Sequence, residues 1–418
     1  MNGVKHTSSV VDALHHIEYA PHSYGPSRSL TIPRADTTNV TILRARSWSR
    51  RIPPPDSRAS TPSQSHFRVH DDFHESKGFW SDIKTLRWMR VPSSSFKLLL
   101  IPVFLYGICE ALAIRPNPFE PMLFISYPIA DSAADDTRYA KGWLDLVFIG
   151  YHIIVFSFIR QFLVLKVIRP ISIRLGIKKQ TKLDRFGEQA YAMIYYGAMG
   201  VWGSFIMRVL PTWWYRTEYF WIDYPHWDMK PQLKRYYLMH LSYWIQQLVV
   251  LALKIEKPRK DFQELVAHHL VTLWLIGWSY GINLTLIGNA VFISMDIPDV
   301  FLALSKICNY LNLTRTKIAV FVVFFAFWSY FRIWLNMVIL LSVWTQYDLM
   351  PDTSKRWAPP EGVWMLWWMK YQIFTPILLL LFLNLFWYYL MLRIGYRALT
   401  QGNTTDERSD DEDDGKDE

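Results

Sequence analysis

Two neighbouring histidines and two aspartates interrupt consecutive apolar stretches of this sequence. His268 and His269 lie in one stretch, and Asp296 and Asp299 lie in the next. An ionisable side chain is costly in the hydrocarbon of a membrane, so each of these residues indicates a functional site. A histidine that a carboxylate orients can serve as a general base or as a nucleophile. We therefore predict that the four residues form a catalytic group.

The spacing along the chain places the histidines and the aspartates at a similar depth. If two antiparallel helices carry them, the first begins near Phe262 and the second ends near Lys306. At a rise of roughly 1.5 Å per residue, His268 lies about 9 Å from that shared end, Asp299 about 10 Å and Asp296 about 15 Å. The matching depths predict one joint site.

The helical period brings further polar residues onto the same faces. Asp296 and Asp299 are three residues apart and share a face with Asn289. Pro298 lies between the aspartates and predicts a kink, because it removes a backbone donor from the helix. On the preceding helix, a spacing of four residues predicts a matching polar stripe of Glu264, His268 and Thr272.

Two other interpretations of the four residues stay open. A buried network of His–Asp hydrogen bonds can hold two membrane helices together without any catalysis. A metal site is the second alternative, but neighbouring histidines point about 100° apart on a helix and few other ligands lie in the apolar stretches. We therefore predict no bound metal.

The whole composition is typical of a membrane protein made of helices. Of 418 residues, 51% are hydrophobic, 16% are aromatic and 19% are charged, which favours apolar spans with aromatic residues at the membrane interface. A transmembrane helix needs about 20 mainly apolar residues. We predict an all-α polytopic membrane protein with about eight such helices, near residues 96–114, 143–167, 189–209, 236–254, 263–281, 285–305, 317–343 and 364–393.

The loop charges predict how the chain is oriented and divided. Basic residues gather in the segments before the first, third, fifth and seventh spans, so the positive-inside rule places both termini in the cytosol. The same basic loops explain the net charge of +9, and we predict no nucleic-acid partner. The predicted parts are a disordered tail (1–75), an interfacial helix with two spans (76–180), a domain of six spans (181–397) and an acidic disordered tail (398–418). In the acidic tail, Ser409 is either a phosphorylation site or part of a solubilising segment.

Several short segments together resemble the Lag motif of the ceramide synthases, which belong to the TLC-domain family. They are residues 259–272 around the histidines, Ser279-Tyr280, Met295-Asp296-Ile-Pro-Asp299 and Ser305-Lys306-Ile-Cys-Asn309-Tyr310, with support from Arg185-Phe186-Gly-Glu188 and Tyr236-Tyr237. The resemblance covers roughly residues 180–397 and is greatest to the fungal branch. The combination of both histidines with both aspartates is its most specific part.

The resemblance implies transfer of a fatty acyl group from acyl-CoA to the amine of a sphingoid base, in the endoplasmic reticulum membrane. It implies a barrel of the last six helices around a substrate tunnel, with the motif at residues 259–310. His268 would accept the acyl group, His269 would assist proton transfer, and Asp296 and Asp299 would orient the histidines. A direct attack by the amine, with His268 as a general base only, is the alternative.

The resemblance also implies supporting residues and partners. Acyl-CoA is a substrate, so no cofactor is expected, and a homodimer and a small single-span accessory subunit are possible partners. The supporting or tunnel-lining residues would be Glu264, Thr272, Ser279, Tyr280, Asn289, Ser305, Lys306 and Asn309. The residues near the CoA headgroup would be Arg259, Lys260 and Arg185.

One departure and two competing functions complete the sequence-based prediction. Pro298 stands where the family usually has a small residue, which affects the geometry between the two aspartates. A non-catalytic TLC-domain protein in lipid sensing or translocation is one alternative, although it would not need the full set of histidines and aspartates. A fatty acid elongase is the other, but residue 265 is Leu, so a His-x-x-His-His box is absent.

Overall fold

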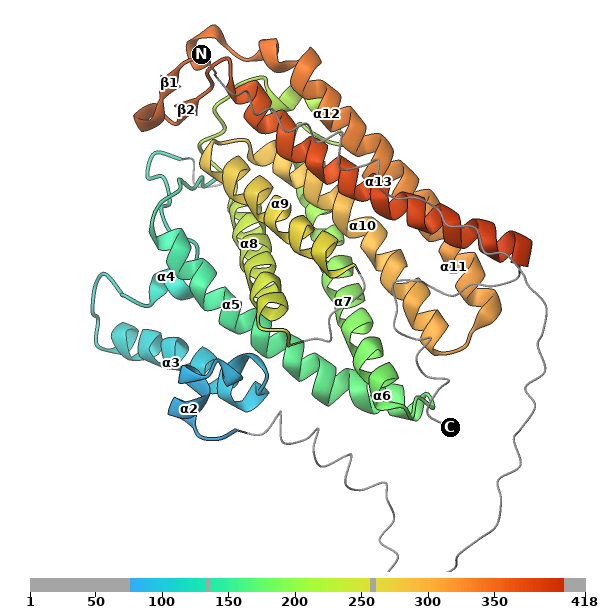
Figure 1. Ribbon diagram of the computed structural model, residues 1–418. Coiled ribbons are helices and arrows are strands. Elements are labelled where there is room, and N and C mark those ends of the chain that lie inside the picture. The colour runs from blue at the N-terminus through green and yellow to red at the C-terminus, as the bar shows by residue number, and fades with distance from the viewer. Residues whose placement is uncertain (1–75, 133–135, 256–260, 402–418) are drawn as a thin grey trace, which may run out of the picture. The chain divides into compact units, whose positions relative to one another are not determined.

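A computed structural model describes residues 76–132, 136–255 and 261–401. The predicted tail 1–75, the residues Arg259 and Lys260, and Ser409 with most of the acidic tail lie outside these ranges. Nearly all regular structure within them is helical (Figure 1). The predicted all-α class is therefore confirmed.

Eight long helical stretches in the described part of the chain lie at the positions of the predicted spans. Five of them are long and apolar enough to cross a membrane, while α7, α8 and α9 carry more polar residues, so the span count of eight stays a prediction. The stretches are α3 (Pro92–Ala111); α5 (Leu144–Phe162) with η3 (Leu163–Ile168) and α6 (Arg169–Arg174); α7 (Gln180–Val209); α8 (Pro231–Ala252); α9 (Phe262–Gly281); α10 (Thr285–Tyr310); α11 (Thr314–Phe327) with η5 (Trp328–Leu335) and α12 (Asn336–Thr345); and α13 (Met369–Gln401).

Short elements lie before and between the long helices. A two-stranded antiparallel sheet pairs Trp357 with Trp364, so the last helix begins at Met369 rather than at the predicted residue 364. At its other end α13 runs to Gln401, four residues into the predicted acidic tail. The short elements are α2 (Phe79–Lys84), η2 (Arg87–Met89), α4 (Glu120–Leu123), η4 (Thr217–Phe220), η6 (Tyr347–Leu349), η7 (Asp352–Ser354), β1 (Trp357–Ala358), η8 (Pro359–Glu361) and β2 (Val363–Trp364).

Helix α10 is the most enclosed of the five apolar helices. It packs against α7, α9 and α11, as the central position of α10 in Figure 1 suggests. Its contact with α7 is close because α7 has glycines there. A Cβ at Gly203 would lie 2.3 Å from the Tyr236 hydroxyl and 3.1 Å from Ile293 of α10. Small residues at such positions let membrane helices approach closely.

The last six helical stretches contact one another in a closed circuit. α7 contacts α8, α8 contacts α9, α9 contacts α13, α13 contacts α12 and η5, and these with α11 return to α10, which contacts α7. α10 also contacts α8 and α9 directly, so side chains occupy part of the interior. A barrel around a continuous tunnel stays a prediction.

A π-helical segment interrupts the seventh predicted span. Residues Trp328–Leu335 form η5 between α11 and α12, and such wide turns often occur at functional sites. Arg332 lies in this segment and is only 3% exposed. The segment therefore brings a cation into the interior beside α10.

Candidate active site

Two cavities meet at His268. The larger, of about 210 Å³, is lined by both histidines and Asp299, and by polar side chains that include Arg160, Glu188, Gln189, Gln247, Asp261 and Lys306. The smaller, of about 40 Å³, is narrow and mostly apolar, and its lining includes His268, Thr272, Leu275, Ile276, Ile287, Val291, Asp296 and Leu380. We call them the polar cavity and the apolar cavity.

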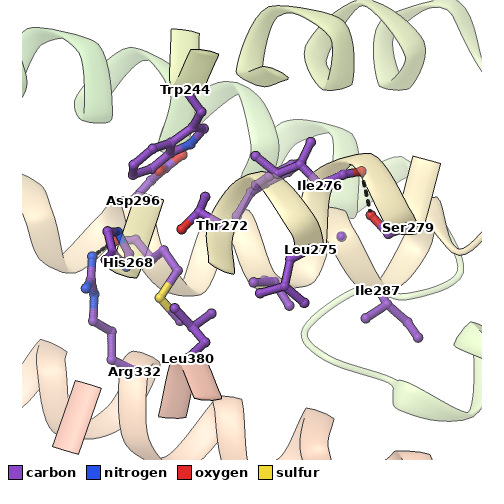
Figure 2. A pocket seen from close by; sticks show the side chains of 14 residues that line it. Trp244, His268, Thr272, Leu275, Ile276, Ser279, Ile287, Asp296, Arg332 and Leu380 are labelled. Carbon is purple, nitrogen blue, oxygen red and sulfur yellow. Dashed lines mark hydrogen bonds between the residues drawn. The ribbon is translucent and has the colours of Figure 1, made fainter. Parts of the chain in front are cut away.

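Only three side chains line both cavities in the described part of the chain: His268, Trp244 and Arg332. Figure 2 shows His268, Asp296 and Arg332 gathered at one end of the apolar cavity, with Ser279 and Ile287 toward the other end. His268 therefore stands between a polar compartment and a narrow apolar one.

The two histidines differ in their hydrogen bonds. Nδ1 of His269 lies 2.8 Å from the Leu265 carbonyl oxygen. Because a carbonyl only accepts, Nδ1 carries the proton and Nε2 has the free lone pair. Nδ1 of His268 is buried and has no hydrogen-bond partner among the described residues. His269 is thus prepared to accept a proton at Nε2.

Two tryptophan rings pack against the histidine rings in T-shaped contacts. Trp244 packs edge-on against His268 and His269, with ring centroids 5.4 and 5.3 Å apart. Trp387 contacts His268 at 5.4 Å from the other side and donates a hydrogen bond to Asp261. These contacts restrict the orientation of His268 at the junction.

Asp299 is paired with Arg332. The guanidinium donates to Asp299 at 2.6 Å, to the Met295 carbonyl at 2.9 Å and to Asn384 at 3.2 Å. The same guanidinium lies over the Trp328 ring, 4.2 Å from its centroid. Arg332 thus neutralises the Asp299 carboxylate, and its guanidinium lies with His268 where the two cavities meet.

Asp296 is buried among aromatic and imidazole rings. Its Oδ2 lies 3.4 Å from Nε2 of His240, yet neither atom completes a hydrogen bond with a described residue. Asp296 and His240 are therefore in close contact, but they are not joined by a hydrogen bond. His240 in turn stacks on Phe292 with centroids 4.1 Å apart. Asp296 and His268 both line the apolar cavity.

Several of the other predicted residues lie at the two cavities. Thr272 and Ser279 line the apolar cavity, and Lys306 lines the polar one. Arg185 pairs at 3.0 Å with Glu188, which lines the polar cavity.

The remaining predicted residues are placed elsewhere. Glu264 and Ser305 line neither cavity, and Asn289 is fully buried in α10 with no hydrogen bond to a described residue. Asn309 accepts a hydrogen bond from Lys317. Tyr280 points away and donates to Asp145 of α5.

Arg332 and His240 were not predicted as site residues. The rule that selected the histidines applies equally to Arg332, a basic residue within an apolar stretch of the sequence. The same rule applies to His240, which lies in the predicted span 236–254, but its proximity to Asp296 depends on how α8 packs against α10. Across residues 76–132, 136–255 and 261–401, no group of three or more His, Cys, Asp or Glu is arranged to hold a metal ion.

Comparison with known proteins shows the family of this chain. The family model of the TLC domain matches residues 185–393. The sphingosine N-acyltransferase lac1 of Schizosaccharomyces pombe is 40% identical over 322 residues, which cover 77% of this chain and 83% of that protein. The ceramide synthase LAG1 of Saccharomyces cerevisiae is 39% identical over 316 residues, which cover 76% of this chain and 75% of that protein.

A more distant relative is the ceramide synthase 4 of Bos taurus, 31% identical over 227 residues, which cover 54% of each chain. The match of the family model includes α7 through most of α13, and therefore the histidines, the aspartates and Arg332. With its eight long helices, its buried His268 and its similarity to these enzymes over three quarters of its length, this chain belongs to the TLC-domain family, in the branch of the fungal ceramide synthases.

Proposed function

We propose that the protein is a sphingosine N-acyltransferase that uses acyl-CoA. The position of His268 between the polar and the apolar cavity carries this proposal. An acyl-CoA has a charged, water-soluble part and an apolar chain, and the thioester joins the two. With the chain in the apolar cavity and the charged part toward the polar cavity, the thioester carbonyl lies beside His268.

The proposed first step transfers the acyl group to His268. Because Nδ1 of His268 is buried, the attacking atom is Nε2. Attack on the thioester carbonyl forms a C–N bond, the C–S bond breaks, and CoA leaves as a thiolate. Arg332 is the nearby cation that stabilises negative charge on the carbonyl oxygen.

The proposed second step forms the amide. The amine of the sphingoid base attacks the acyl-imidazole, and the bond between the acyl carbon and His268 breaks. Nε2 of His269 accepts the proton that the amine loses, which the hydrogen bond from His269 to Leu265 favours. In sum, one proton moves from the amine to the CoA thiolate. In the alternative without a covalent intermediate, His268 takes the proton and the amine attacks the thioester directly.

The deciding experiment compares two histidine variants. Purified full-length protein is incubated with acyl-CoA and a sphingoid base, and amide product is measured. His268→Ala is expected to lower turnover by more than about 100-fold. His152→Ala is the matched control, because His152 lies in α5, where it contacts the Phe148 carbonyl and lines neither cavity. Unchanged turnover in His268→Ala would disprove the assignment.

Location and partners follow as proposals from the same function. The loop charges support a cytosolic location for the open end of the α9–α10 hairpin, where acyl-CoA is available. We place the protein in the endoplasmic reticulum membrane, and glycosylation-site insertion into the loops tests the orientation. Co-purification with a single-span subunit and the mass of the detergent complex test the accessory subunit and the dimer.

A further inference from the structure

The end of the apolar cavity that lies away from His268 includes one polar contact among its aliphatic side chains. Ser279 and Gly288 both line this end. The Tyr237 hydroxyl makes a 2.6 Å hydrogen bond with Ser279. A Cβ at Gly288 would lie 1.5 Å from that hydroxyl. The ring of Tyr237 therefore fits only because residue 288 has no side chain.

Behind Tyr237 lies a buried network of charges that the proposed reaction does not use. The ring of Tyr280 is 5.7 Å from that of Tyr237, and its hydroxyl donates to Asp145 at 2.8 Å. Asp145 is also paired at 2.8 Å with Lys234, which is fully buried and donates to the Ser126 and Ala140 carbonyls. Asp145 and Lys234 therefore neutralise each other's charge within the protein.

We propose that Tyr237 closes the far end of the acyl-chain site and so sets the longest acyl chain that the enzyme accepts. We call this closed end the floor. Tyr237 is held there by its hydrogen bond with Ser279, by its close approach to Gly288 and by the Asp145–Lys234–Tyr280 network. The proposal deepens the proposed function and rests on it for the identity of the chain. From His268 to Ser279 the site extends about 16 Å along α9, at roughly 1.5 Å per residue.

Binding energetics favour a sharp limit on acyl-chain length at this floor. Each methylene that enters the apolar cavity strengthens binding by about fourfold. A chain long enough to displace Tyr237 would break its hydrogen bond with Ser279 and press on Tyr280, which would leave buried polar groups without partners. The loss from these groups exceeds the gain from one or two more methylenes, so affinity stops rising where the chain reaches Tyr237.

The test measures binding as a function of chain length. Wild-type full-length protein in detergent is titrated with a series of non-hydrolysable acyl-CoA thioethers that differ by single methylenes. Ser279→Leu adds volume at the floor. In this variant we expect affinity to stop rising at a chain length about two carbons shorter than in the wild type. Tyr237→Phe removes the hydroxyl, leaves Ser279 bonded to the Ile276 carbonyl, and is expected to admit one or two more carbons.

A matched control adds the same side chain elsewhere on α9. Gly277→Leu lies two residues before Ser279 on an exposed side of the helix, where a Cβ meets nothing within 4 Å. It is expected to keep the wild-type limit. If Ser279→Leu does not fold, Tyr237→Phe alone decides. An unchanged limit in Tyr237→Phe, and in Ser279→Leu where it folds, overturns the proposal.

Two further results distinguish failure of the proposed floor from failure of the proposed function, and show whether the cavity holds the acyl chain or the sphingoid base. If thioethers bind with a length limit that the variants move, yet no amide forms with acyl-CoA and a sphingoid base, the floor stands and the proposed function fails. If the limit in amide formation moves with the length of the sphingoid base rather than of the acyl chain, the cavity holds the base and the proposal is overturned.

Discussion

At the scale of single residues, the site consists largely of buried polar groups. His268 and His269 are 7% and 8% exposed, and Asp296 is 1% exposed. Groups buried in this way need partners within the protein. Arg332 meets that need for Asp299, whereas Asp296 and His268 keep atoms without hydrogen bonds to described residues.

Removing Arg332 is expected to affect both stability and activity. Arg332→Met leaves Asp299, whose side chain is 15% exposed, without its cation. Breaking a fully buried pair costs about 3–5 kcal/mol, so we expect a loss near or below the lower end of that range. Thermal unfolding in detergent measures the loss. The double variant Arg332→Met with Asp299→Asn is expected to regain much of the stability, because no charge is left unpaired, while turnover stays low. Recovery of turnover together with stability would show that the pair is only structural.

His269 is expected to act after His268. In His269→Ala the acyl group can still be transferred to His268, but the amine lacks its proton acceptor, so turnover falls by about 10²–10⁴-fold. Intact-mass measurement after mixing with acyl-CoA is expected to show an acyl adduct that persists when the sphingoid base is added. Absence of the adduct in this variant would favour direct transfer.

At the scale of helices, close packing of α7, α8 and α10 places Asp296 and His240 together. Glycines on α7 permit it, because Tyr236 of α8 and Ile293 of α10 occupy the space where the side chain of residue 203 would lie. Tyr236 packs against His240 with ring centroids 4.5 Å apart. The position of His240 therefore depends on a helix contact that one methyl group can disturb.

Substituting two glycines of α7 is expected to have opposite effects. Gly203→Ala introduces a Cβ 2.3 Å from the Tyr236 hydroxyl, and overpacking of this kind costs about 1–3 kcal/mol. Gly197→Ala meets nothing within 4 Å and gains up to about 1 kcal/mol of helix propensity. The thermal midpoints of both variants in one detergent check the difference. Equal midpoints would contradict the packing described for Gly203.

At the scale of the whole described chain, a charged network joins α5 to the domain that contains the site. Lys234 of α8 pairs with Asp145 of α5, and Lys141, in the loop before α5, donates to the Tyr280 carbonyl and to Asn283 beyond α9. Segments far apart in the sequence are thus connected at the end of α9 that lies away from His268. The network stabilises the attachment of α5 and also backs the proposed floor.

Lys141 is expected to make stability depend on pH. Burial, with the nearby Lys234, lowers its pKa from 10.5 to about 7. Between pH 7 and 10.5 the unfolded chain therefore binds more protons, so stability rises with pH by at most about 1.4 kcal/mol per pH unit. Below pH 7 both states are protonated and this slope disappears. Lys141→Met is expected to lose the slope in unfolding curves measured from pH 6 to 9. Parallel curves for variant and wild type would exclude this role.

Much of the fold could be predicted from local patterns. The apolar stretches located the long helices because hydrocarbon requires about 20 apolar residues per helix, although Trp364 proved to be the last residue of β2, outside α13. The ionisable residues His268, His269, Asp296 and Asp299 identified the site because their cost in a membrane is visible in the sequence alone. Thr272, Ser279 and Lys306 line the two cavities, whereas Tyr280 joins a different network, and the roles of all four stay predictions.

The sequence by itself determined the all-helical membrane class, the approximate helix positions and the identity of the site's histidines and aspartates, since hydropathy and helical period act over a few neighbouring residues. Only the tertiary structure decided that Arg332 pairs with Asp299, that His240 lies beside Asp296, and that Tyr237 is hydrogen-bonded to Ser279 at the apolar cavity. Each of these contacts joins helices that are far apart along the chain. Their geometry depends on interhelix packing, down to the missing methyl groups of Gly203 and Gly288, and no local pattern encodes that packing.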